Sequence, residues 1–170
     1  DMSQCTPRLK SMTRDMKKHY ATIPPLRRRP PVNSLVVARP FQDPFLTDEF
    51  HRAYVQGWPE DSDTKVNVFF VDYGITATVE SLQVRMLEPT FAKYEFQAIS
   101  CHIDGVNADE LWSTDIREQL KKLLNKKFLK TRVVQLLSDM IIVEADFFNQ
   151  SFAEFLIKMG LQKDGRFILS

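Results

Sequence analysis

The side chains that could carry out catalysis are few and widely spaced along the chain. The three histidines, His19, His51 and His102, lie far apart, and none has a cysteine or carboxylate at the spacing of a metal site. Adjacent acids such as Asp109 and Glu110 suit helix caps or a solvated surface better than an acid–base pair. The five glycines form no phosphate-binding loop and no nucleophile elbow. We therefore expect no catalytic residue, no metal site, no cofactor and no enzymatic activity.

Aromatic side chains offer a different chemistry, because the π face of a ring attracts a cation by roughly 0.5–2 kcal/mol. Phe69 and Phe70 are neighbours on an expected strand, so their rings must point to opposite faces of a sheet. Tyr73 stands just before Gly74, where the backbone can turn sharply and leave the ring at a rim. For Phe70 and Tyr73, core packing and cation binding both stay open. Core packing is the simpler interpretation for three rings: Phe50, Tyr54 and Phe69.

The net charge of +1 conceals two regions of opposite sign. Residues 1–31 carry eight basic and two acidic side chains, a net charge of +6, whereas residues 32–170 carry 15 basic and 20 acidic ones, a net charge of −5. An acidic body suits a cationic peptide better than a nucleic acid, although solvated surface charge explains the same pattern. Direct binding of nucleic acid is therefore not favoured.

The composition is that of a globular protein. With 170 residues, 44% of them hydrophobic and 26% charged, the chain is long enough to bury a core. No apolar run approaches the roughly 18 residues that cross a bilayer, so we expect no membrane contact. Cys5 and Cys101 lack the spacing of a disulfide framework or a zinc site, which favours a reducing, intracellular compartment.

Hydrophobic periodicity predicts a helix, a barrel and a mixed second half. Apolar residues at helical spacing predict a helix over residues 9–20, and the proline-rich run 23–31 ends it and is typical of a solvated linker. A small, strongly bent antiparallel barrel is expected from the short strands 35–38, 50–55, 65–74, 76–79 and 84–87. In the second half we expect strands at 96–103, 130–136 and 140–144 and helices over 112–124 and 152–159.

Three motifs, in this order along the chain, carry a resemblance to a known family. Residues 68–74, V-F-F-V-D-Y-G, closely resemble the V-x-F-[IV]-D-Y-G-N signature of Tudor domains, and residues 50–55, F-H-R-A-Y-V, resemble the family's W-Y-R-A-x-V strand. Residues 96–103, F-Q-A-I-S-C-H-I, resemble the P-x-Q-A-I-x-C-x-L segment of extended Tudor domains of the animal germline. The resemblance covers residues 9–160, and the chain is identified by it as an extended Tudor domain.

The resemblance implies an α+β, mainly β fold, in which an SH3-like Tudor barrel is joined by a helix to a staphylococcal-nuclease-like OB-fold unit. We accordingly expect an N-terminal helix and basic proline-rich linker over residues 1–31, the Tudor barrel over residues 32–89, and the nuclease-like half over residues 90–170. In the family, two strands of the OB unit precede the long helix, which here starts almost at residue 1. Those strands are expected either to lie before residue 1 or to be missing from this member.

The resemblance also implies a function. Such domains are non-enzymatic scaffolds of the piRNA pathway, in which small RNAs silence genes in the germline. They bind arginine-rich N-terminal tails of Piwi-family Argonaute proteins, usually with symmetrically dimethylated arginine held in an aromatic cage. We therefore expect Piwi-family tails, and further scaffold proteins of the pathway, as partners. The expected location is the cytoplasm, in the perinuclear germ granules called nuage.

The cage of this chain departs from the family's pattern. His51 stands where the family has a tyrosine, and a protonated imidazole repels a cation. Ile75 stands where the family has an asparagine that accepts from the guanidinium, and the lost acceptor costs roughly 1–3 kcal/mol. We therefore expect binding that depends weakly on methylation, or a preference for unmethylated arginine. The expected peptide-binding residues are Phe70, Tyr73, His51, Phe45 and Ile75, with Phe41 and Asp72 as additional candidates.

Two alternatives to peptide binding stay open. If the cage is vestigial, the domain serves self-association or contact with another scaffold, for which an apolar Ile75 beside Phe70 and Tyr73 could provide a surface. The second alternative is an RNA-binding nuclease-like module, which would use the basic leader together with Lys121-Lys122 and Lys126-Lys127.

Overall fold

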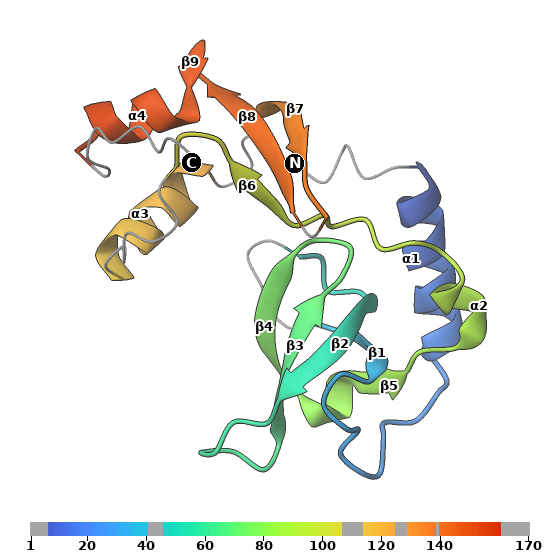
Figure 1. Ribbon diagram of the computed structural model, residues 1–170. Coiled ribbons are helices and arrows are strands. Elements are labelled where there is room, and N and C mark those ends of the chain that lie inside the picture. The colour runs from blue at the N-terminus through green and yellow to red at the C-terminus, as the bar shows by residue number, and fades with distance from the viewer. Residues whose placement is uncertain (1–6, 41–45, 107–113, 125–128, 139, 161–170) are drawn as a thin grey trace. The chain divides into compact units, whose positions relative to one another are not determined.

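The computed structural model describes residues 7–40, 46–106, 114–124, 129–138 and 140–160. The chain divides into two compact units, one of residues 3–99 and one of residues 100–170 together with the first two residues. Each unit contains one β-sheet, and the described part of the protein is mainly β with a few helices, in agreement with the expected fold class (Figure 1). Residues 90–99, which we had assigned to the second half, belong to the same compact unit as the barrel.

The first unit is built around a five-stranded antiparallel sheet with the strand order β4-β3-β2-β1-β5. The connections from β3 to β4 and from β4 to β5 are short, and the sheet curls into the barrel that the closely spaced apolar runs predicted (Figure 1). Its strands are β1 (Leu35–Ala38), β2 (His51–Gly57), β3 (Lys65–Phe70), β4 (Ile75–Glu80) and β5 (Val84–Met86), with a 3₁₀ turn at Ser81–Gln83.

Every second side chain along a strand points into the barrel and fills its core. Phe70 is fully buried in this core, whereas its neighbour Phe69 faces outward and is half-buried, as strand alternation requires. Phe69 stacks on Tyr54 with 5.1 Å between the ring centroids, so these two rings lie outside the core and the interpretation of them as core residues was wrong. The buried members of the barrel core are Val36, Ala38, Leu46, Ala53, Val55, Val66, Val68, Phe70, Val79 and Val84.

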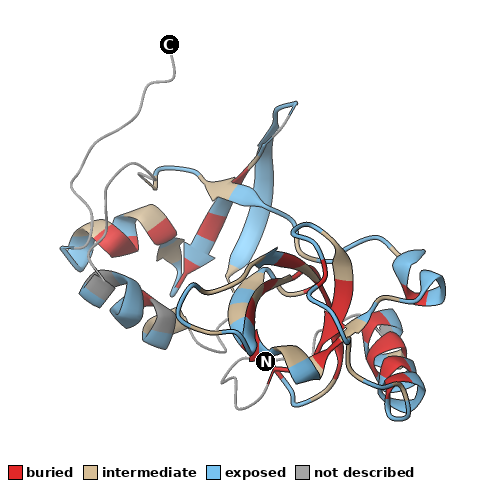
Figure 2. Ribbon diagram, turned by 90° about the horizontal axis from the view of Figure 1, so that it is seen from below, coloured by how far each residue is buried: buried red, intermediate tan, exposed pale blue. Residues whose placement is uncertain are grey.

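Helix α1 (Pro7–Tyr20) covers one side of the barrel and confirms the helix predicted from apolar spacing. Its buried stripe of Leu9, Met12, Met16 and Tyr20 packs on Val37, which points out of the barrel where Val36 points in. Strand β1 is therefore buried on both faces. Figure 2 shows the buried residues of the helix gathered on one side and those of the strands lining the barrel.

The segment between α1 and β1 is attached to the barrel, and the expectation of a solvated linker was wrong for it. Leu26 packs against the barrel core, and its N–H donates to the carbonyl of Val84 at 3.4 Å. The Asn33 N–H donates to the carbonyl of Val55 at 2.7 Å. Pro30 is buried. The basic, proline-rich segment is therefore a strap along the barrel.

The predicted strand over residues 96–103 is confirmed only at its end, β6 (Cys101–Ile103). After a single helical turn, α2 (Pro89–Ala92), the chain up to residue 100 forms no ladder, because other groups use its backbone. Arg52 donates to the carbonyls of Tyr94 and Glu95, and the N–H of Gln97 donates to Asp72. Within the predicted strand, the ion pair thus takes the N–H of Gln97, and the N–H of Ala98 donates to the carbonyl of Val71 at 3.1 Å.

The second unit contains a sheet of order β6-β8-β7, in which β6 runs parallel and β7 antiparallel to β8. Two helices pack on it through Leu120, Phe152, Phe155 and Leu156. The last helix ends at Lys158, one residue before the predicted end, and Gly160 just beyond it has a positive φ of 68°. The elements are α3 (Thr114–Leu124), β7 (Lys130–Leu136), β8 (Ile141–Phe147), β9 (Gln150–Ser151) and α4 (Phe152–Lys158).

Candidate functional site

Three of the predicted cage residues come together at one end of the barrel. His51 begins β2 and Phe70 ends β3, and the pairing of Ala53 with Phe70 brings these two strand ends side by side. The tight turn that follows β3 then returns Tyr73 to the same end, because the N–H groups of Tyr73 and Gly74 both donate to the carbonyl of Phe70. Gly74 has a φ of 68°, which a residue with a side chain adopts only at a cost.

The rings of this group meet edge to face. The centroid of His51 lies 5.0 Å from that of Tyr73 and 6.0 Å from that of Phe70, with interplanar angles of 85° and 89°. The His51 Nε2 atom is held by Thr47, with its carbonyl oxygen at 3.0 Å and its Oγ1 at 3.2 Å. These contacts hold the imidazole ring in place, so that it packs against the Tyr73 ring.

Burial distinguishes the three rings. Phe70 is 0% exposed and His51 is 1% exposed, whereas Tyr73 is half-buried and lies beside both the barrel core and the α1 cluster. Among these three rings, Tyr73 is therefore the one that an arriving cation can reach. Phe41 and Phe45, the candidates for a further cage ring, lie outside the described residues.

Ile75 lies directly across the ladder from Phe70. Its side chain is half-buried and packs against the barrel core. An isoleucine offers a guanidinium no hydrogen-bond acceptor. At this position the site therefore offers apolar contact.

Asp72 is buried and its carboxylate is engaged within the protein. Arg52 Nε donates to Asp72 Oδ2 at 2.9 Å and Arg52 Nη2 donates to Oδ1 at 2.5 Å, while the N–H of Gln97 donates to Oδ1 at 3.2 Å. The remaining donors of Arg52 reach the carbonyls of Phe91, Tyr94 and Glu95. The structure thus places Asp72 in a buried clasp between the barrel and the segment after it.

Arg52 was missed as a key residue at the sequence level. The available signal was a charged side chain inside an apolar strand pattern, at Arg52 in β2 and again at Asp72 immediately after β3. Charged residues are rarely buried unless they are paired. Two such residues on segments expected to be adjacent would have predicted an ion pair.

Neither a metal site nor a membrane-spanning helix is found in the described part of the chain. No group of three or more histidine, cysteine, aspartate or glutamate side chains there is arranged to hold a metal ion. Likewise, no helix among the described residues has both the length and the apolar character needed to span a bilayer.

Comparison with known proteins defines the class of protein. The Tudor domain family model matches residues 2–105, and the chain belongs to this family. RING finger protein 17 of Homo sapiens is 26% identical to it over 118 residues, which are 65% of this chain and 7% of that protein. The chain therefore spans less than a tenth of the length of this curated relative.

Two solved structures have the same fold. The human TDRD1 extended Tudor domain, in complex with a symmetrically dimethylated peptide, matches with a TM-score of 0.73 at 24% identity, over 94% of this chain and 80% of that chain. Extended Tudor domain TD3 of mouse TDRD1, in complex with a MILI peptide containing dimethylarginine, matches with a TM-score of 0.70 at 21% identity, over 91% of this chain and 78% of that chain. The fold is that of an extended Tudor domain, a Tudor barrel with a nuclease-like unit.

Proposed function

We propose that this chain is a non-enzymatic scaffold domain that binds arginine-rich peptides of Piwi-family Argonaute proteins. Support comes from the fold, because similar extended Tudor domains have been solved with dimethylated peptides. The observation that carries the proposal is the ring group of His51, Phe70 and Tyr73 at one end of the barrel. A part-exposed tyrosine ring at the end of the barrel attracts a guanidinium through its π face.

The same geometry supports weak dependence on arginine methylation. Methyl groups strengthen binding when several ring faces enclose the cation, and in this group the faces of Phe70 and His51 are buried. Ile75 adds no acceptor that would orient a methylated guanidinium. Binding then depends on charge and on the Tyr73 face, and both act on methylated and unmethylated arginine.

Calorimetric titration of one arginine-rich peptide, in unmethylated and symmetrically dimethylated forms, tests this proposal. We expect dissociation constants within about threefold of each other, and Tyr73→Ala should weaken both to a similar extent. Tyr54→Ala is a suitable control, because Tyr54 lies on the outer face of the barrel. A tenfold preference for the methylated form that Tyr73→Ala abolishes would show that the cage is intact.

Restoring an acceptor at position 75 should strengthen peptide binding. In the Ile75→Asn variant we expect the dimethylated peptide to bind about five- to tenfold more tightly than to the wild type, since one charge-assisted hydrogen bond contributes roughly 1.5–3 kcal/mol before costs. Thr76→Asn is the matched control, because Thr76 is exposed and points to the opposite face of β4. Equal gains in the two variants would contradict a role for position 75.

Self-association is a second candidate, and it has a surface of its own on β7 rather than at Ile75. Every residue of β7 is exposed, including Val133 at 55% and Leu136 at 72%, and the strand lies at the edge of the described sheet. Exposed edge strands with apolar side chains can pair with a second copy. Light scattering of the wild type and of Val133→Lys tests for self-association through β7. A wild-type dimer that the substitution dissociates supports this function, and a wild-type chain that stays monomeric at high protein concentration rejects it.

RNA binding has less support from the structure. Several cations of the basic leader are already engaged, since Lys17 pairs with Glu49 at 2.9 Å and Arg8 lies 4.2 Å from the ring centroid of Tyr94. Side-chain placement at Lys121 is not described, and residues 126–127 lie outside the described residues. RNA affinity at physiological salt tighter than the roughly 10⁻⁴–10⁻⁶ M of non-specific binding would favour this candidate.

A further inference from the structure

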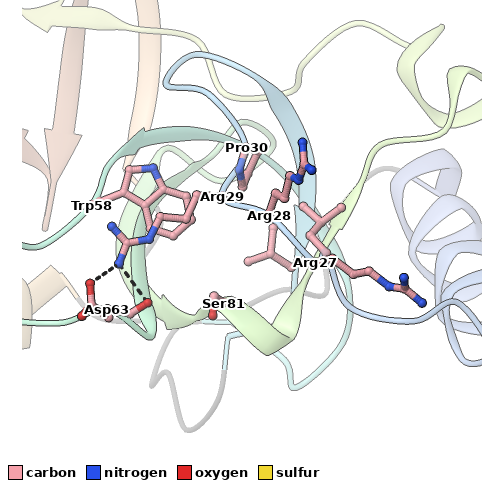
Figure 3. A pocket seen from close by; sticks show the side chains of 9 residues that line it. Arg27, Arg28, Arg29, Pro30, Trp58, Asp63 and Ser81 are labelled. Atoms are coloured by element: carbon pink, nitrogen blue, oxygen red, sulfur yellow. Dashed lines mark hydrogen bonds and ion pairs between the residues drawn. The ribbon is translucent and has the colours of Figure 1, made fainter.

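A pocket lies between the strap and the connection from β2 to β3, and Arg29 is one of the residues that line it. The guanidinium carbon of Arg29 lies 4.8 Å from the ring centroid of Trp58. Its Nη2 atom donates to Asp63 Oδ1 at 2.6 Å and to the Asp63 backbone carbonyl at 3.0 Å. Figure 3 shows this guanidinium against the indole, whereas those of Arg27 and Arg28 point away from it. The lining of the pocket combines strap residues, among them Leu26 and Arg29, with Trp58, Asp63, Ser81 and Val84.

These contacts supply the three groups that bind a guanidinium: an aromatic face, a carboxylate and a carbonyl oxygen. The loop from Trp58 to Asp63 contains three acidic residues. Among the described residues, Asp63 is the one of the three whose carboxylate forms an ion pair. The Asp63 carboxylate is therefore the anionic group that pairs with a guanidinium at this loop. Arg29 and Asp63 are 45% and 101% exposed at their side chains, so water and competing ligands can reach the contact.

The pocket is separate from the ring group of His51, Phe70 and Tyr73. Successive connections of an antiparallel sheet alternate between its two ends. The ring group lies where β2 begins and where β3 ends, whereas Trp58 and Asp63 lie between the end of β2 and the start of β3. The two sites are consequently at opposite ends of the barrel strands.

The strap that carries Arg29 is fastened on both sides of this residue. Leu26 is bonded to Val84 before it, and Asn33 is bonded to Val55 after it. This attachment keeps Arg29 close to Trp58 at a high effective concentration. The ion pair and the cation–π contact of Arg29 are nevertheless exposed to solvent, and such exposed contacts contribute little to stability.

We propose that the loop of Trp58 and Asp63 is a second arginine-binding site, which accepts an unmethylated arginine from an arginine-rich peptide of another chain when Arg29 leaves it. Arg29 is the resident competitor, so the site is partly closed in the isolated domain. The preference for unmethylated arginine follows from the hydrogen bonds: one nitrogen, Nη2, makes both bonds to Asp63. Symmetric dimethylation leaves that nitrogen one N–H, which can make only one of them.

The test uses the whole chain and capped tri-arginine, with the indole N–H signal of Trp58 in a ¹H–¹⁵N spectrum as the readout. The signal is assigned by its loss in Trp58→Phe, which also separates it from that of Trp112. We expect Arg29→Ala to bind the peptide at least fivefold more tightly than the wild type, because the competitor is gone. Arg28→Ala, with the same change of charge, should bind like the wild type.

Three comparisons in the Arg29→Ala protein define the site. Capped tri-lysine and symmetrically dimethylated tri-arginine should each bind at least threefold more weakly than tri-arginine, and Asp63→Asn should weaken tri-arginine binding. An indole signal that tri-arginine does not shift in Arg29→Ala would overturn the proposal, as would an equal gain in Arg28→Ala. Tyr73→Ala should leave the titration of Trp58 unchanged, so the outcome here is distinguishable from failure of the proposed function.

Discussion

Arg52 and Asp72 form the most deeply buried ion pair among the described residues, with side chains 0% and 1% exposed. The carboxylate accepts from two guanidinium nitrogens and from the Gln97 N–H, and Arg52 satisfies its other donors on three carbonyls. Such a pair repays its desolvation only when every donor and acceptor is satisfied. At the scale of single residues, this clasp holds residues 91–97 on the barrel.

Asp72→Asn should therefore destabilise the protein by about 3–5 kcal/mol, because it leaves the Arg52 charge buried without a partner. Urea unfolding followed by circular dichroism measures this cost. Asp48→Asn is the matched control: Arg39 binds Asp48 through the same two-pronged contact, at 2.7 and 2.8 Å, but both side chains are largely exposed. Equal effects of the two substitutions would show that burial does not govern the pair.

At the scale of elements, Tyr20 connects α1 to the end of the barrel sheet. Its hydroxyl donates to the carbonyl of Met86 at 3.1 Å and accepts from the N–H of Glu88 at 2.8 Å, and its ring packs with Phe50 and Phe91. The residue is 1% exposed. Tyr20 thus adds a buried polar anchor to a helix stripe that is otherwise methionine and leucine.

Tyr20→Phe should cost about 1–3 kcal/mol at neutral pH, because a buried N–H and a buried carbonyl lose their partner. Burial raises the pKa of the Tyr20 phenol above its ordinary value. The contribution of the hydroxyl is therefore complete below about pH 10 and declines as the pH rises through the folded-state pKa. Urea titrations from neutral pH to about pH 11 should show that the difference in unfolding free energy between wild type and Tyr20→Phe narrows once the pH exceeds about 10.

Tyr54→Phe is the control for this measurement, because Tyr54 is half-buried on the outer face of the barrel and lies outside its core. Its stability should follow that of the wild type across the same pH range. If the difference in unfolding free energy between wild type and Tyr20→Phe stayed constant to the alkaline end of the titration, it would contradict the role of the buried hydroxyl.

At the scale of the whole molecule, each of the two units has its own core. Residues 3–99 contain the barrel core and the cluster under α1, and residues 100–170 contain a third cluster around Phe147 and Leu156. The first unit needs the residues after its last strand, since Phe91 packs under α1 and the clasp binds the carbonyls that follow. A fragment that stops at the last barrel strand is therefore incomplete.

We expect the fragment 3–99 to fold on its own and to unfold in a single cooperative transition. The fragment 3–89 should have a melting temperature lower by about 10 °C or more, because it lacks both Phe91 and the carbonyls that satisfy Arg52, a loss of several kcal/mol in a small domain. Thermal melts by circular dichroism compare the two. Equal melting temperatures would show that residues 90–99 add nothing to the barrel.

Much of the local structure could be predicted from the sequence alone. Apolar spacing predicted α1 and α4, the alternation of residues 65–70 separated Phe70 from Phe69, and the turn at Gly74 was expected from its residue type. The ordered motifs also indicated the family, which the family model confirms. These features depend on neighbours within a few positions of the chain, and short-range patterns carry that information.

Other features were decided by tertiary structure. The sequence motif marked residues 96–103 as a strand, but the N–H groups of Gln97 and Ala98 donate to Asp72 and to the Val71 carbonyl, more than twenty positions earlier. The strap was expected in solvent, yet Trp58 and Asp63 hold Arg29 from about thirty positions away. The charge and ring types were visible in the sequence, but a hydrogen bond or ring contact requires a distance of a few ångströms, which only the folded chain sets.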